Sequence, residues 1–378
     1  MPVLYPGASR TRSHTLSEYA ADDIVKISAT EAVRKRPVMY LGGTDTLGLH
    51  RSVELLLDEP FASARRGECG EIQVELRPEG GVSVFDSGPL VPRETLVQET
   101  RDEGLQLGFT RGWDLVVVCM LSSRFQVDQW EGGLQWRLRG ERGVPSGLFH
   151  PVLPTEPVPG GASRGTRVDF MPDASLLDVT DFDPERLLGL CRRLAFLAPG
   201  LRVRFAAPAR GLAFALHYPG GIRQRVAELT ADHPRPHPEP LVFELWAGEV
   251  RVQCALQWSD SDGALLSFVN CMEPQAYGVR YGVPVEQLFR ALRTAFVSLP
   301  GKGHLRGTHP RLKRGLTAIL TTSTSDLFQH SRLRSLPDLS GAMARRLKPL
   351  LKQALKEHPG LSRFLTAPRA SRSPRQDR

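Results

Sequence analysis

The order of hydrophobic patterns in the first half of the chain restricts the fold more than any other feature. Residues 24–36 and about 49–64 carry apolar side chains at helical spacing, and Pro37 is expected to stop the first helix. A later helix is expected at 184–197. The segments with strand character are 71–77, 81–86, 132–143, 165–171 and 201–205. Helices followed by antiparallel strands predict a layered α+β domain that ends near residue 215.

A second α+β unit is predicted after a polar, Pro/His-rich connector at 231–240. Its expected strands and helices are 241–246, 250–257, 265–270, 285–298, 315–321 and 340–358. His233 and His237 lie among prolines in the connector without a third ligand, so we interpret them as part of a solvated loop. The predicted organisation is therefore a flexible lead, two domains and a basic disordered tail, at 1–18, 19–215, 216–362 and 363–378.

Charge is unevenly distributed along the 378 residues, whose net charge is +8. Residues 301–378 contain 17 Lys and Arg but four Asp and Glu, giving +13 there and −5 in the remainder. A basic final third predicts an anionic partner. Five cysteines without a C-x-x-C pair argue against a disulfide framework and against a thiolate zinc site. Because no secretory signal or membrane-length apolar run is readable, we expect a cytoplasmic protein.

The string AVRKRPVMYLG at 32–42 resembles the opening of the family formed by the B-subunits of DNA gyrase and topoisomerase IV. The resemblance covers about 17–360, with gaps. It continues in order through Gly48-Leu49-His50, Asp58, Cys69, Glu71-Ile72, 84–88, Gly165-Thr166, 217–222, 255–260 and 268–270. It implies an α+β chain with a Bergerat-type (GHKL) ATP-binding α/β sandwich, followed by a transducer domain of the ribosomal protein S5 domain 2-like fold.

The catalytic position of the family is altered in this chain. A glutamate on the family's second helix activates the water that attacks the γ-phosphate, and an ungapped alignment of 48–72 places Leu55 there. Leucine cannot accept a proton, and the adjacent Glu54 is rotated by about 100° on a helix. We therefore expect no catalytic residue and interpret Leu55 as part of the core.

The family's magnesium-binding asparagine lies one turn beyond the base, and Glu59 occupies that position here. Glu59 is the one weak candidate for a metal ligand, because it can bind Mg²⁺ but adds negative charge beside three phosphates. Pro60 follows it inside the expected helix. ATP and Mg²⁺ are thus possible cofactors through the resemblance, and the residues leave their binding in doubt.

The adenine end of the family site is better preserved. The resemblance assigns Asp86 to the carboxylate that accepts the adenine amino group, Gly88 to the family's first glycine, and Thr166 to the supporting hydroxyl. Pro89 and Leu90 replace the family's arginine and second glycine. Asp-Ser-Gly after a strand is also an ordinary turn, so nucleotide binding and a structural turn both remain open.

The phosphate end is poorly preserved. A family lid of about three dozen residues, which closes in a glycine-rich turn that cradles phosphates, is reduced here to about 93–111. Gly112 is the one surviving glycine of that turn, and Trp113 and Asp114 add bulk and negative charge. A collapsed lid is the expected result. Arg332 is the best match to the transducer lysine that contacts the γ-phosphate, and an exposed loop cation is an equal alternative.

Other matches concern partners and drugs. Tyr19 and Ile24 have the spacing of the arm residues that cross between the two copies of gyrase B, which predicts a homodimer; packing on their own domain is the alternative. Trp130 replaces the arginine that contacts aminocoumarins in the family. Basic residues in the final third predict sequence-independent contacts to DNA phosphates, whereas a merely solvated surface is the alternative: Arg311, Lys313, Arg314, Lys348, Lys352 and Lys356.

Together these residues predict a degraded gyrase-B-like ATPase and transducer paralogue. It is expected to act as a dimeric pseudo-ATPase that binds duplex DNA or a topoisomerase-related protein. The alternative is a working ATP-hydrolysing component of a type II DNA topoisomerase whose Toprim domain lies on another chain. A decaying gene is a third interpretation. The Toprim carboxylate motifs are not found in the 378 residues, so we expect this chain to need a partner for DNA cleavage.

Overall fold

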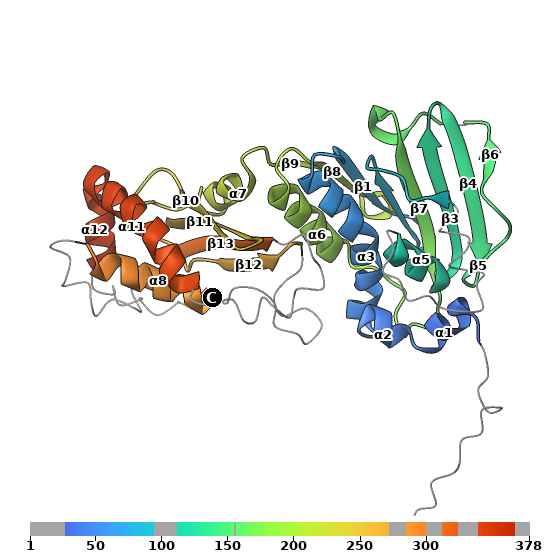
Figure 1. Cartoon of the computed structure of the whole chain (residues 1–378), viewed down its shortest axis with the longest axis horizontal. Coiled ribbons are helices and arrows are strands. Elements are labelled where there is room, and N and C mark those ends of the chain that lie inside the picture. The colour runs from blue at the N-terminus through green and yellow to red at the C-terminus, as the bar shows by residue number, and fades with distance from the viewer. Residues whose placement is uncertain are drawn as a thin grey trace, which may run out of the picture.

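The computed structural model describes residues 27–93, 112–154, 156–271, 285–299, 312–323 and 339–366. These residues form two regions, each built on its own β-sheet (Figure 1). Strands up to His217 form the first sheet, and strands from Leu241 onward form the second. In the described part of the chain no helix is long and apolar enough to cross a membrane.

The first sheet contains nine strands among the described residues. Their order is β5-β4-β3-β7-β2-β1-β8-β9, and β6 pairs with β4. β1 runs parallel to β8, and the other pairs are antiparallel. The bounds are β1 Glu71–Leu76, β2 Val82–Asp86, β3 Ser122–Glu131, β4 Leu134–Glu141, β5 Val144–Pro145, β6 His150–Val152, β7 Gly165–Pro172, β8 Arg202–Ala207 and β9 Leu212–His217.

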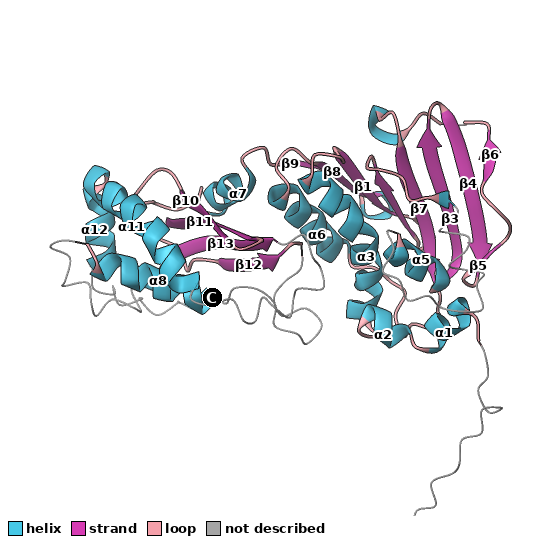
Figure 2. Ribbon diagram, viewed as in Figure 1, coloured by secondary structure: helices cyan, strands magenta, loops and turns pink. Residues whose placement is uncertain are grey.

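Helices cover one face of this sheet (Figure 2). They are α1 (Ala29–Lys35), α2 (Pro37–Leu41), α3 (Thr46–Arg65), α5 (Trp113–Met120) and α6 (Pro184–Leu197). Alternation places Ile72 and Val74 of β1 in the core beneath them, where both are buried. Pro37 does more than stop a helix, because it is the first residue of α2, where a missing N–H costs nothing. Pro60 lies inside α3, which continues past it.

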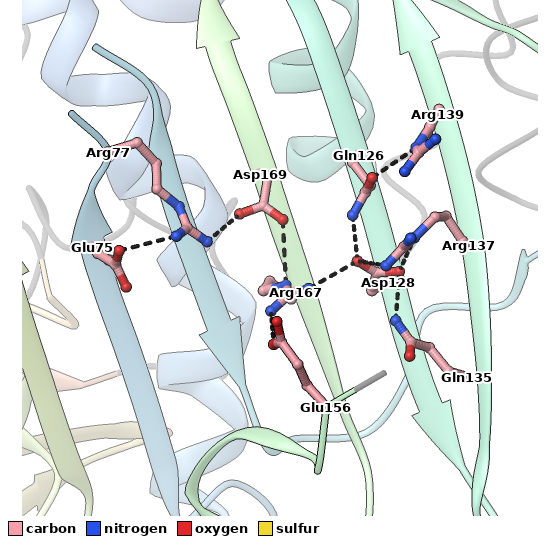
Figure 3. Close-up of polar contacts among 10 residues, drawn as sticks. All are labelled: Glu75, Arg77, Gln126, Asp128, Gln135, Arg137, Arg139, Glu156, Arg167 and Asp169. Carbon is pink, nitrogen blue, oxygen red and sulfur yellow. Dashed lines mark hydrogen bonds and ion pairs between the residues drawn. The ribbon is translucent and has the colours of Figure 1, made fainter. Parts of the chain in front are cut away.

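The opposite face of the first sheet carries a network of ion pairs (Figure 3). Asp128 has no exposed surface and accepts hydrogen bonds from Arg137 at 2.7 Å and Arg167 at 3.3 Å. Burial raises the pKa of Asp128, but the hydrogen bonds from Arg137 and its neighbours outweigh burial and hold it below its usual value. Arg167 also pairs with Asp169, which pairs with Arg77. The buried charge of Asp128 is therefore compensated by its pairing with Arg137 and Arg167.

The second sheet has the order β10-β11-β13-β12. Its strands are β10 (Leu241–Ala247), β11 (Val250–Trp258), β12 (Leu265–Val269) and β13 (Leu316–Ser323). Its helices are α8 (Val285–Val297), α11 (Leu339–Glu357) and α12 (Pro359–Thr366), which share a core with one face of the sheet. The prediction that the disordered tail begins at 363 is wrong for 363–366. These residues complete α12, whose Leu361 and Leu365 are buried in that core.

The two regions meet through a continuous core. α7 (Gly221–Leu229) follows β9, and Phe196 of α6 packs against Tyr218 and against Phe268 of β12. The connector also contributes buried structure, so its interpretation as a solvated loop is wrong for His237, which is 2% exposed. Its Nε2 accepts the backbone N–H of Trp258 and its Nδ1 donates to a backbone carbonyl, which fixes a neutral ring. Burial lowers the pKa of His237.

Candidate nucleotide site

Helix α3 supplies one wall of the candidate site, and its middle is apolar. Leu55, Leu56 and Leu57 are all buried, and Leu55 is 7% exposed. The three side chains belong to the hydrophobic core of the first region. At the position that the resemblance assigns to the catalytic base, the side chain therefore packs against apolar neighbours and offers no proton acceptor.

Glu54 is the nearest carboxylate along the helix, but two arginines hold it. Its oxygens lie 3.2 Å from Arg51 Nη1 and 3.5 Å from Arg193 Nη2 of α6. Its side chain is thus directed toward the contact between α3 and α6. A water activated for attack on a phosphate would need a base beside the phosphates, and Glu54 is committed elsewhere.

Glu59 follows one turn later on α3. Its Oε1 accepts hydrogen bonds from Ser63 Oγ at 3.3 Å and from Arg66 Nη2 at 3.2 Å. The Arg66 guanidinium also pairs with Glu68 on the same exposed surface. These contacts come from the last turns of α3 itself. Within the described residues, no group of three or more His, Cys, Asp or Glu side chains is arranged to hold a metal ion.

The end of β2 places three of the predicted adenine residues together. Asp86 is the last residue of β2 and lies opposite Thr166 of β7 in the antiparallel register. Asp86 Oδ1 accepts the backbone N–H of Gly88 at 2.8 Å. A Cβ at Gly88 would lie 2.8 Å from the same oxygen, so a side chain there would disturb this turn. Burial, and then the charge of Asp86, raise the pKa of the neighbouring Cys69 thiol to about 11.

The start of α5 is the predicted phosphate end, and its glycine is tightly packed. Gly112 is the N-cap of α5 with φ +97°, a backbone conformation that favours glycine. A Cβ added to Gly112 would lie 2.4 Å from Cγ1 of Val91, which is itself buried. The backbone of this turn is therefore closed off by an apolar side chain on that side.

Asp114, in the first turn of α5, adds negative charge to the same place. Its pKa is raised to about 6, chiefly by burial; the charges of Asp58 and Glu59 add to this shift, and Arg51 opposes it. These groups belong to α3, so the first turn of α5 faces acidic side chains across the candidate phosphate site. An incoming phosphate would meet this negative field.

Comparisons with known proteins agree with the resemblance. The crystal structure of the B-subunit of the DNA gyrase from Myxococcus xanthus is 40% identical, with a TM-score of 0.76, and the match covers 90% of this chain and 99% of that chain. The DNA gyrase B-subunit of Haloferax lucentense is 29% identical over 333 residues, which are 82% of this chain and 52% of the relative. The chain belongs to the DNA gyrase B-subunit family. No protein-family model matches it.

The fold prediction is confirmed by these comparisons. The 43K ATPase domain of Thermus thermophilus gyrase B in complex with an aminocoumarin has the same fold at 23% identity, with a TM-score of 0.69 over 92% of this chain and 94% of that one. This gyrase-B-family chain is thus a type II topoisomerase B-subunit-like protein with a GHKL ATPase fold. It spans about half the length of the Haloferax relative.

A polar contact that joins the two regions was not predicted from the sequence. Asp58 of α3 accepts a hydrogen bond from the Cys271 thiol, which follows β12, with an Sγ–Oδ1 distance of 3.2 Å. Burial raises the pKa of Asp58, and Arg51 partly offsets that effect. At the end of α3, Arg65 Nη1 donates to the side chain of Asn270 at 2.9 Å. The helix of the candidate site therefore contacts the second region directly.

The remaining predicted residues are dispersed or undescribed. Arg332, Arg311, Tyr19 and Ile24 lie outside the described residues. Trp130 is 3% exposed and packs against Phe85 and under Arg167, on the face of the sheet that bears the ion-pair network. Of the residues predicted to contact DNA, five lie in the described part of the chain, and all five are exposed: Lys313, Arg314, Lys348, Lys352 and Lys356.

Proposed function

We propose that this chain is a gyrase-B-like ATPase and transducer module that no longer hydrolyses ATP and acts as a homodimer on duplex DNA. The observation that carries this proposal is the burial of Leu55 in the core at the position of the family base. The nearest carboxylate, Glu54, is held by Arg51 and Arg193 and cannot replace that base without breaking both ion pairs.

Adenine recognition is the part of the family function that we propose to be retained. Asp86 and Thr166 lie opposite each other at the ends of adjacent strands, with Gly88 leaving space beside the carboxylate. The phosphate end lacks comparable support, because Val91 covers Gly112 and Asp114 adds a carboxylate. The proposed site therefore binds the base of a nucleotide more than its phosphates, with no dependence on Mg²⁺.

A steady-state ATPase assay of the purified chain tests the loss of hydrolysis. We expect no turnover above background in wild-type protein. The Leu55→Glu variant should remain inactive, since the phosphate end is also altered. The control is Asp86→Asn: turnover that is present in wild-type protein and lost in this variant would identify a working ATP-hydrolysing component of a type II topoisomerase.

DNA binding is proposed from the charge of the final third. Residues 301–378 carry +13, and Lys348, Lys352 and Lys356 are exposed on α11 opposite its buried residues Met343 and Leu347. Spacing of four residues puts the three lysines on one helix face. Such a face contacts phosphates without reading the sequence of the bases.

Salt-dependent binding to short DNA duplexes of different sequence tests this part. Reversing Lys348, Lys352 and Lys356 to Glu should weaken binding equally on all duplexes and reduce the slope of log K against log salt by about 2.7, or 0.9 for each lost phosphate contact. A matched control reverses three exposed arginines of the first region, Arg124, Arg186 and Arg210, which changes net charge equally. An equal loss in both variants, or no shift of DNA by wild-type protein at low salt, would favour a protein partner instead.

Dimerisation is proposed from the match of Tyr19 and Ile24 to the family's exchanging arm. Sedimentation equilibrium of wild-type protein and of Tyr19→Ala tests it. We expect wild-type protein to be a dimer and the variant to have a higher dimer dissociation constant. The reason is that Tyr19→Ala removes a large side chain that would be buried on the partner. Monomeric wild-type protein at high concentration would refute the homodimer.

A further inference from the structure

A small cavity lies where the two regions meet. Its volume is about 130 Å³, room for several water molecules or one small organic molecule. The first region contributes the end of α3 and the end of α6, and the second contributes the face of the sheet that points toward them. Phe61 and Phe196 form part of its apolar wall, and both side chains are buried.

The polar wall of the cavity is cationic. None of its 14 lining residues is Asp or Glu, whereas Arg65 and Arg223 both line it. Arg223 pairs with Glu239 in an exposed ion pair at the rim. For Arg65, the described residues provide the side-chain carbonyl of Asn270 as a hydrogen-bond acceptor but no carboxylate within ion-pair distance.

Arg65 therefore has no compensating carboxylate among the described residues, and its side chain lies at the exposed rim of the cavity. Burial, and then the positive charge of Arg251, lower the pKa of its guanidinium. Arg251 is itself paired with Glu244 through two hydrogen bonds, so that carboxylate is already committed. A guanidinium at such a position gains most from an oxyanion that can accept two parallel hydrogen bonds.

The cavity also contains the other groups that such an oxyanion needs. Thr321 and Ser323 of β13 line it, and both residues are buried. Gly220 and Gly221 line it at the start of α7, a helix of nine residues, where their N–H groups donate to Gln224 Oε1 and to the Tyr218 carbonyl. The positive end of the helix dipole favours an anion near this end.

We propose that this cavity binds a small organic anion, with its oxyanion directed to Arg65 and the hydroxyl groups of β13 and its apolar body against Phe61 and Phe196. Because Arg65 ends α3 and Thr321 belongs to the second sheet, the bound anion bridges the two regions. Its occupancy would then stabilise their present arrangement. The site is separate from Asp86 and does not depend on nucleotide binding.

Fluorine NMR with para-fluorobenzoate as the probe tests this site in the full chain. We expect line broadening of the probe on addition of wild-type protein, which unlabelled benzoate reverses by competition. Benzamide, which has nearly the same shape but no charge, should compete at least about tenfold more weakly, because the charge-assisted hydrogen bonds are lost.

Amino-acid substitutions test whether the probe binds in this cavity. Arg65→Gln should weaken the probe about tenfold or more, and Thr321→Val, which conserves shape, should weaken it several-fold. The control is Arg66→Gln, since Arg66 is the next residue but pairs with Glu59 and Glu68 and does not line the cavity. Circular dichroism checks that each variant is folded. Equal competition by benzamide, or equal affinities of Arg65→Gln and Arg66→Gln, would overturn the proposal, as would the absence of any probe binding.

Discussion

The adenine end and the hydrolytic end of the candidate site lie on neighbouring elements but differ in what the fold requires of them. At the adenine end, the Asp86 carboxylate closes a turn by accepting the Gly88 N–H, so the residue that would recognise a base also shapes the backbone. At the hydrolytic end, the base position is occupied by Leu55, which packs in the core. A carboxylate at that position would act in catalysis and would add nothing to the packing of the core.

This difference indicates which residues of a catalytic site are retained when its catalytic activity is lost. Residues with a second role in the fold are retained for structural reasons, whereas a buried catalytic carboxylate costs free energy and can be replaced by an apolar side chain that stabilises the core. Gly88 and Asp86 belong to the first class, and position 55 belongs to the second. The predictions below test this division at both ends.

The largest effect is expected at Leu55. Truncation by Leu55→Ala should lower the free energy of unfolding by about 2–5 kcal/mol, because it removes buried methyl groups and leaves a cavity. Chemical denaturation measures this. On the same helix, Leu47 is 51% exposed, and Leu47→Ala should change stability by about 0.5 kcal/mol or less. Similar small values for both variants would mean that position 55 faces an open site, against our account.

The next effect is expected at Asp86. Asp86→Ala should weaken binding of adenosine by about 1–3 kcal/mol, since the carboxylate proposed to accept the adenine amino group is removed. Calorimetric titration of adenosine into each variant measures this change. Thr166→Val conserves shape at the opposing position and should show a smaller loss in the same direction. Undiminished affinity in Asp86→Ala would place the nucleotide elsewhere.

A smaller effect is expected at Asp114. Because the pKa of its carboxyl is raised from 3.8 to about 6 in the folded protein, the folded state binds an extra proton between these pH values. Stability contributed by this group therefore falls as pH rises through that window. Asp114→Asn should raise the free energy of unfolding at pH 7 by about 1–2 kcal/mol, with no gain below pH 4. A variant that is less stable than wild-type protein at pH 7 would contradict the raised pKa.

Much of the architecture could be predicted because long periodic segments dominate it. The helix expected at 184–197 is α6 with the same bounds, since Asp183 caps it and its apolar residues repeat at helical spacing. Strand β9 was missed because Leu212–His217 lacks the alternation of buried and exposed residues. Helix α5 was missed because its run of apolar residues has no clear period.

The candidate site could be predicted from the sequence only in part, for a different reason. An ungapped alignment can place Leu55 and Asp86, because each depends on a short local segment. The contact between Asp58 and Cys271 joins residues 213 positions apart, and the cavity beside Arg65 exists only once the two regions are packed. No pattern in one sequence encodes such distant pairs without knowledge of the fold.

The most direct test of the central claim compares adenosine with a non-hydrolysable ATP analogue by calorimetry, each with and without Mg²⁺. If adenine recognition is retained and the phosphate end is lost, the two ligands should bind with affinities within about tenfold of each other, and Mg²⁺ should change neither affinity. An analogue that binds far more tightly than adenosine, and does so only with Mg²⁺, would show a working phosphate site and contradict the account.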